Sequence, residues 1–155
     1  MTTNSSINRM LRRRLVLAIA AALGPALASA EPIPRGHPDR RWYEAAESMR
    51  RLALSWGDQP YGAVLVTASG IVAEGPSRVV KNSDPGAHAE REAIREAQRR
   101  LGTQNLAGSV LYSTSRPCSL CEQAAAEAKV SRMFFGPQLV DAGAPRQERS
   151  AGDAD

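Results

Sequence analysis

Residues 63–74 read Ala-Val-Leu-Val-Thr-Ala-Ser-Gly-Ile-Val-Ala-Glu, and this stretch decides the fold class. The apolar run 63–67 and the segment 71–74 predict two short strands, and residues 68–70 predict the turn between them. We therefore expect a β-hairpin. Helical and extended patterns alternate after it, which predicts a mixed sheet covered by helices on its faces.

The elements around the hairpin are predicted from the spacing of apolar residues. Asp39 is expected to cap a helix whose apolar positions run from Trp42 to Trp56, and Gly57 ends that helix. The other expected elements, in chain order, are a loop at 75–86, a helix at about 87–101, a strand at 110–114, a helix at about 117–128 and a strand at 133–136.

The first thirty residues have the pattern of a secretory signal peptide. Arginines at 9 and 12–14 precede the apolar run 15–23, and Ala28-Ser-Ala30 is a small-residue cleavage site. That run is shorter than the roughly 20 residues a membrane span needs, so we expect cleavage rather than a membrane anchor. The expected location is periplasmic or secreted, with no membrane attachment after cleavage. Arg12-Arg13 also suggests the twin-arginine export route.

These segments predict four parts of the chain. Residues 1–30 form the signal peptide, and the Pro-rich residues 31–38 form an extended linker. Residues 39–136 form one domain, and the polar residues 137–155 are expected to be a disordered tail.

The positive net charge of the chain belongs to its predicted leader. The whole sequence carries 20 Lys and Arg against 16 Asp and Glu, and residues 1–30 hold four arginines and no acidic residue. The remainder is therefore formally neutral. A protein that grips a nucleic-acid backbone usually shows a basic excess, and this chain predicts none after cleavage.

Two short motifs carry the chemistry, and each opens a predicted helix. The first is His88-Ala-Glu90, and the second is Pro117-Cys-Ser-Leu-Cys121. Residues three apart share a helix face, and the start of a helix favours thiolates. Cys118, Cys121 and His88 supply the three protein ligands of a catalytic zinc, which keeps one position open. Glu90 is near enough to move protons without being a ligand.

Neither motif is specific alone, but their combination and order match the signature of zinc deaminases. The alternative for the only two cysteines is a structural or redox disulfide, which leaves His88 and Glu90 unexplained.

The chain resembles the cytidine deaminase-like superfamily, and within it the branch of guanine deaminases and tRNA adenosine deaminases. The resemblance covers roughly residues 40–136. It is carried by the following stretches: Gly57-Asp-Gln-Pro-Tyr-Gly-Ala-Val-Leu-Val66, Asp84-Pro-Gly-Ala-His-Ala-Glu90, Leu111-Tyr-Ser-Thr-Ser-Arg-Pro-Cys-Ser-Leu-Cys121 and Val130-Ser-Arg-Met-Phe-Phe-Gly136.

This resemblance implies a three-layer α/β/α sandwich with a mixed sheet, shortened at its C-terminal end. It implies hydrolytic loss of an amino group from a purine or pyrimidine, with zinc held by His88, Cys118 and Cys121 and with Glu90 as the general acid and base. The Ala89 N–H is expected to contact the substrate. A homodimer is compatible with the resemblance.

The chain departs from its relatives in three places. Ser77 stands where they usually have a substrate-contacting Asn, and we expect Ser77 to contact the substrate in its place. Arg116 stands where an acidic or apolar residue is usual, and the C-terminus is short. We expect a small nucleobase or nucleoside, of guanine or cytosine type, as the substrate. The alternatives are a tRNA or polynucleotide adenosine deaminase and a non-catalytic zinc-binding relative.

Overall fold

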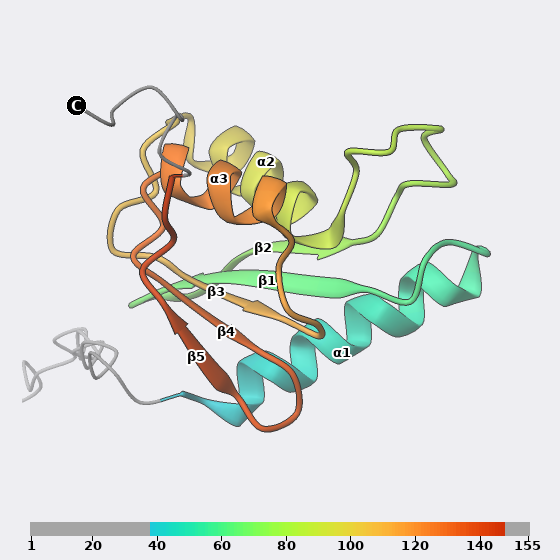
Figure 1. Ribbon diagram of the computed structural model, residues 1–155, viewed down its shortest axis with the longest axis horizontal. Helices are drawn as coiled ribbons and strands as arrows, with labels where there is room; N and C mark the ends of the chain where they lie inside the picture. The colour runs from blue at the N-terminus through green and yellow to red at the C-terminus, as the bar shows by residue number, and fades with distance from the viewer. Residues whose placement is uncertain (1–37, 148–155) are drawn as a thin grey trace, which may run out of the picture.

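The computed structural model describes residues 38–147 as eight elements (Figure 1). They are, in chain order, α1 (Arg40–Ser55), β1 (Gly62–Thr67), β2 (Gly70–Pro76), α2 (Ala89–Leu101), β3 (Val110–Ser113), α3 (Ser119–Glu127), β4 (Arg132–Phe135) and β5 (Val140–Gly143). The predicted signal peptide and most of the predicted linker lie outside the described residues.

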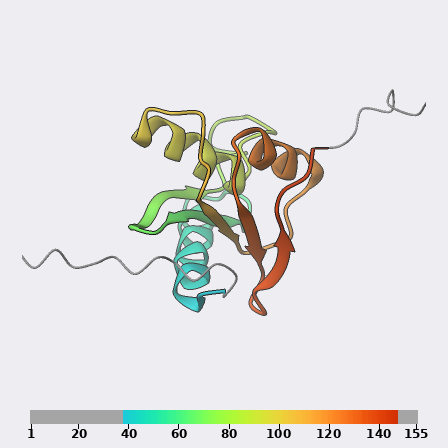
Figure 2. The ribbon, with the colours of Figure 1, turned by 90° about the vertical axis from the view of Figure 1, so that its left-hand side faces the viewer.

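The five strands form one mixed sheet in the order β2-β1-β3-β4-β5. Strand β1 is antiparallel to both β2 and β3, β3 is parallel to β4, and β5 is antiparallel to β4. Helix α1 covers one face of the sheet, and α2 and α3 cover the other (Figures 1 and 2). The predicted hairpin and the three-layer α/β/α arrangement with a mixed sheet are confirmed.

Each face of the sheet has its own hydrophobic core. Between the sheet and α1, the buried residues include Ala46, Val64 and Tyr112. Between the sheet and the other two helices they include Leu65, Ile94 and Met133. Alternate residues of one strand therefore serve opposite cores, as the pleat of a strand requires.

Small residues bring α2 close to the sheet. A Cβ atom at Gly75 in β2 would collide with the backbone of Ala89 and Ala93 in α2. Glycine is thus needed for close approach at this position. The contact fixes the start of α2, which carries His88 and Glu90.

The prediction of a disordered tail from residue 137 is wrong for its first part. Residues 140–143 form β5, which pairs along β4 and is held by an ion pair of 2.9 Å between Arg132 and Asp141. The segment is too short to show strand periodicity, but the free edge of β4 offers backbone partners that no local pattern reveals. Residues 148–155 lie outside the described part. Between residues 38 and 147, no helix has the length and apolar character needed to cross a bilayer.

Candidate metal centre

His88 and Cys118 occupy equivalent positions in the fold, each as the N-terminal cap of a helix. His88 has extended backbone angles (φ −65°, ψ 152°) and precedes α2, and Cys118 (φ −75°, ψ 168°) precedes α3. The helices predicted from about 87 and 117 therefore begin two residues later, at Ala89 and Ser119. Because α2 and α3 lie side by side on one face of the sheet, their first turns meet (Figure 1).

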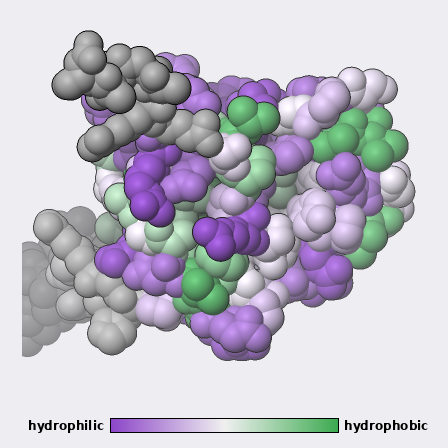
Figure 3. All heavy atoms as spheres, viewed as in Figure 1, coloured by the Kyte–Doolittle hydropathy of each residue, from purple (hydrophilic) through white to green (hydrophobic). Residues whose placement is uncertain are grey.

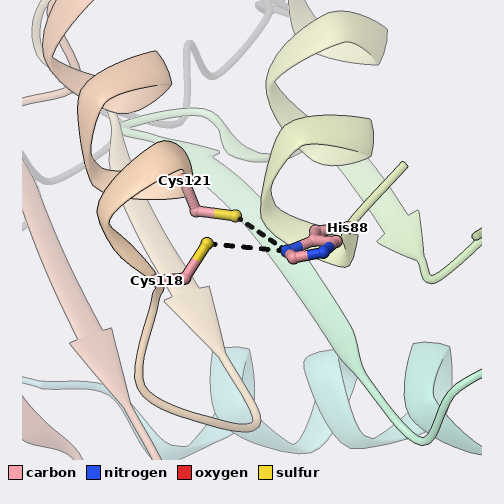
Figure 4. A group of neighbouring side chains, drawn as sticks. All are labelled: His88, Cys118 and Cys121. Atoms are coloured by element: carbon pink, nitrogen blue, oxygen red, sulfur yellow. Dashed lines mark hydrogen bonds between the residues drawn. The ribbon is translucent and has the colours of Figure 1, made fainter. Parts of the chain in front are cut away.

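The three predicted ligands converge at this meeting point. The Nδ1 atom of His88 lies 3.4 Å from the Sγ of Cys121 and 3.6 Å from the Sγ of Cys118. All three ligand atoms lie within 4.8 Å of one another, and the side chains face a common point (Figure 4). Cys121 is buried and Cys118 is exposed, so the group is reachable from one side.

These distances fit a zinc ion. Zinc bonds of about 2.0 Å to nitrogen and 2.3 Å to sulfur, at tetrahedral angles, separate the two atoms by about 3.6 Å. The nitrogen–sulfur distances of 3.4 and 3.6 Å agree with this value. One imidazole and two thiols also form a donor set that zinc prefers, with a fourth position left for another ligand. The cysteines are free thiols rather than a disulfide.

Glu90 lies beside the ligands and is almost completely buried. Its side chain is 5% exposed, and its Oε2 accepts a hydrogen bond of 3.6 Å from the Sγ of Cys121. Burial raises the pKa of Glu90 above its usual value, although its hydrogen bonds oppose the shift. A carboxyl group with a raised pKa next to a metal site is suited to taking up and releasing a proton.

The Cys121 thiol has its pKa raised, first by burial and then by the neighbouring charge of Glu90. Without a cation, the pocket thus disfavours the thiolate. A bound divalent cation inverts this balance, because a coordinating thiol is deprotonated.

The two predicted substrate contacts differ in their surroundings. Ala89 is the first residue of α2, so its N–H has no acceptor within the helix and points out of the first turn. Ser77 is fully buried, and its Oγ donates a hydrogen bond of 2.8 Å to the Oδ1 of Asp58. The roles of Ala89 and Ser77 in binding substrate stay predictions. Sequence patterns gave no sign of Asp58, which lies 19 positions away from its partner.

Arg116 is exposed and lines a cavity of about 230 Å³ between α3 and the edge formed by β4 and β5. Pro117, Glu122 and Arg146 also line this cavity. Arg146 pairs with Glu122 at 3.6 Å, whereas Arg116 has no ion-pair partner between residues 38 and 147. An unpaired positive charge therefore lies two residues before a metal-ligand position.

The fold and the donor set define a zinc-binding deaminase domain. The pattern of the cytidine and deoxycytidylate deaminase zinc-binding region matches residues 37–137. The chain belongs to this family of zinc-binding deaminase domains.

Two kinds of relative are similar to the chain. Guanine deaminase of Bacillus subtilis (strain 168) is 40% identical over 83 residues, which are 54% of this chain and 53% of that protein. The tRNA-specific adenosine deaminase of Buchnera aphidicola subsp. Schizaphis graminum is 33% identical over 107 residues, which are 69% of this chain and 71% of that protein. The chain thus spans about half the length of the first relative and more of the second.

The same two kinds of deaminase are found among the solved structures that resemble the chain. The Bacillus subtilis guanine deaminase superposes with a TM-score of 0.61 at 33% identity and covers 64% of each chain. A structure from a study of tRNA:A34 deaminases has a TM-score of 0.61 at 35% identity and covers 63% of this chain and 71% of that one. The resemblance to the branch of guanine deaminases and tRNA adenosine deaminases is confirmed. These similarities do not distinguish a free base from tRNA as the substrate.

Proposed function

We propose that this protein removes an amino group by hydrolysis from a free nucleobase or nucleoside of the guanine or cytosine type and releases ammonia. One observation carries the proposal. The buried carboxyl group of Glu90 lies 3.6 Å from a metal-ligand atom but outside the converging set of His88, Cys118 and Cys121. A proton carrier beside a three-ligand zinc site is the arrangement that hydrolytic deamination requires.

Each residue has a separate task in this proposal. Bound zinc would act as a Lewis acid that activates water. His88 Nδ1 and the two Sγ atoms hold the metal, so that its position relative to Glu90 is fixed by two helix starts. The carboxylate of Glu90 takes one proton from the water and passes it to a ring nitrogen. It then moves the second proton from the same oxygen to the leaving amine, so that ammonia departs and a carbonyl group remains on the ring. The free N–H of Ala89 donates a hydrogen bond to the substrate.

The surroundings support a small, planar substrate. Two exposed apolar residues adjoin the metal ligands along the chain. Leu120 (60% exposed) lies between Cys118 and Cys121, and Val80 (59%) belongs to the loop that leads to His88. In Figure 3, a hydrophobic cluster at the upper right lies where Figure 1 draws the loop between β2 and α2. Apolar surface with a few convergent polar groups is typical of sites for small heterocycles.

A tRNA adenosine deaminase is the second candidate. Relatives with this name match as much of the chain as guanine deaminase does or more. The neutral charge of residues 31–155 argues for the small substrate, because tRNA binding draws on a basic surface.

The test is ammonia release from the zinc-loaded protein with guanine, cytosine, adenine, their nucleosides and a tRNA anticodon stem-loop. The Glu90→Ala variant is the matched negative control, and Glu127→Gln, which changes an exposed acid on α3, is the matched positive control. Release from one base or nucleoside that Glu90→Ala abolishes supports the proposal. Release from the stem-loop alone establishes the second candidate, and no release from any compound with zinc bound refutes both.

We also propose export to the periplasm or outside the cell, after cleavage following Ala30, and assembly as a homodimer. The pattern of residues 1–30 supports export. N-terminal sequencing of the protein from a periplasmic fraction should start at Glu31. Sedimentation should give twice the monomer mass. A protein retained with residues 1–30 intact, or one that sediments as a monomer, would contradict the respective statement.

A further inference from the structure

The loop between β2 and α2 leads directly into His88. Its two ends are joined by a hydrogen bond of 3.0 Å from the N–H of Arg78 to the carbonyl of Ala87. Inside the loop, the N–H of Asn82 donates to the carbonyl of Arg78 at 2.9 Å. The two ends of the loop are therefore held together. Contacts that fix the position of Arg78 also fix the position of Ala87, which directly precedes His88.

Asp58 fixes the first residues of this loop. Asp58 is 6% exposed and lies in the turn between α1 and β1. One carboxylate oxygen accepts hydrogen bonds of 2.8 Å from the Ser77 hydroxyl and from the N–H of Gln59, and the other accepts one of 2.8 Å from the N–H of Lys81. Hydrogen bonds to a carboxylate are about twice as strong as those between neutral groups.

A second contact holds the same loop from the same turn. The Lys81 ammonium lies 3.9 Å from the ring centroid of Trp56, and the Arg78 guanidinium lies 5.2 Å from it. Trp56 directly follows α1, two residues before Asp58. Cation–π contacts at these distances are attractive. The end of α1 thus contacts both the first residues and the middle of the loop.

We propose that Asp58, acting through Ser77 and Lys81, is a positioning residue for the metal ligand His88. This inference rests on the proposed function and deepens it. Ser77 then serves the loop rather than the substrate, because its hydroxyl proton is committed to Asp58 and its side chain is fully buried. Groups that hydrogen-bond directly to a metal ligand typically change metal affinity 10- to 100-fold when they are removed. Asp58 acts on His88 only through the loop, so its effect belongs at the lower end of this range.

The test uses the purified protein with the substitution Asp58→Asn, which keeps the shape of the side chain. The N–H of Lys81 then faces either the NH₂ group of the amide, which cannot accept its hydrogen bond, or the neutral amide oxygen, which is a weaker acceptor than a carboxylate. Ser77→Ala removes one hydrogen bond and leaves the two backbone contacts, so it is expected to fold. Glu74→Gln, an exposed acid on β2, is the matched control. Zinc affinity is measured by competition with a chelator, and thermal unfolding is followed with and without zinc.

We expect Asp58→Asn to weaken zinc binding by about 10-fold and Ser77→Ala to weaken it less, with Glu74→Gln unchanged. The rise in melting temperature on adding zinc should shrink in the same order. A purely structural role would lower the melting temperature equally with and without zinc, and this outcome overturns the inference. If Asp58→Asn fails to fold, wild-type zinc affinity in Ser77→Ala overturns it. If the wild-type protein binds zinc but releases no ammonia, the proposed function is contradicted. The comparison of zinc affinities between the wild type and the variants still tests the role of Asp58.

Discussion

Replacing Glu90 by glutamine should abolish most of the turnover and leave the metal site occupied. Glutamine has the same shape, but it cannot accept and return a proton. General acid–base catalysis contributes about 10²- to 10⁴-fold, and Glu90 is the one carboxyl group in contact with a ligand of the described site. We therefore expect kcat to fall by about 10³- to 10⁴-fold, which corresponds to about 4 to 5 kcal/mol of transition-state stabilisation.

The assay is the initial rate of ammonia release at saturating substrate, for the substrate that the panel identifies. Zinc content is measured on the same samples, because Glu90 lies outside the converging set of ligands and its substitution should keep one zinc per chain. Glu127→Gln is the control for loss of a negative charge on a nearby helix. A Glu90→Gln variant that keeps zinc and retains more than about a tenth of wild-type kcat would show that another group moves the proton.

Three further predictions concern the metal and the fold. Cys121→Ser replaces a buried ligand and should weaken zinc binding by more than about 100-fold in a chelator competition; an unchanged affinity would remove Cys121 from the ligand set. Gly75→Ala should lower the free energy of unfolding in urea by about 1–3 kcal/mol, since the added Cβ collides with the backbone of α2, and wild-type stability would contradict the close approach. Hydrogen bonds from the side chains of Arg99 and Arg100 lower the pKa of Glu96 to about 2. The contribution of Glu96 to the free energy of unfolding is therefore fully present above the unfolded carboxyl pKa of about 4.3 and is lost as the pH falls through 2. Because this ion pair lies at the surface, Glu96→Gln should cost less than about 1 kcal/mol at pH 7 and clearly less near pH 2, where about half of the Glu96 side chains are already protonated; equal losses at both pH values would contradict the assigned cause.

The cluster of candidate metal ligands was predictable because each motif that forms it is only a few residues long. His88, Cys118 and Cys121 each lie at the start of a helix, and two such starts on one face of a sheet are brought together by the α/β arrangement itself. Spacing within each motif then sets which atoms face one another. The hairpin and the boundaries of α1 were predictable for the same reason, since apolar periodicity and a capping Asp39 act over a few residues.

Strand β5 and the contact of Asp58 with Ser77 were not predictable, because each depends on a partner distant in the sequence. Residues 140–143 form a segment of only four residues with a single large apolar side chain, and they become a strand only because the edge of β4 is available. Asp58 looks like an ordinary turn residue until the loop after β2 folds over it. The departure at Ser77 is informative for this reason. The hydroxyl at this position donates its proton to a buried carboxylate. If Ser77 serves the loop, as we propose, the choice of substrate depends on other groups, and the Ala89 N–H is the first of them to test.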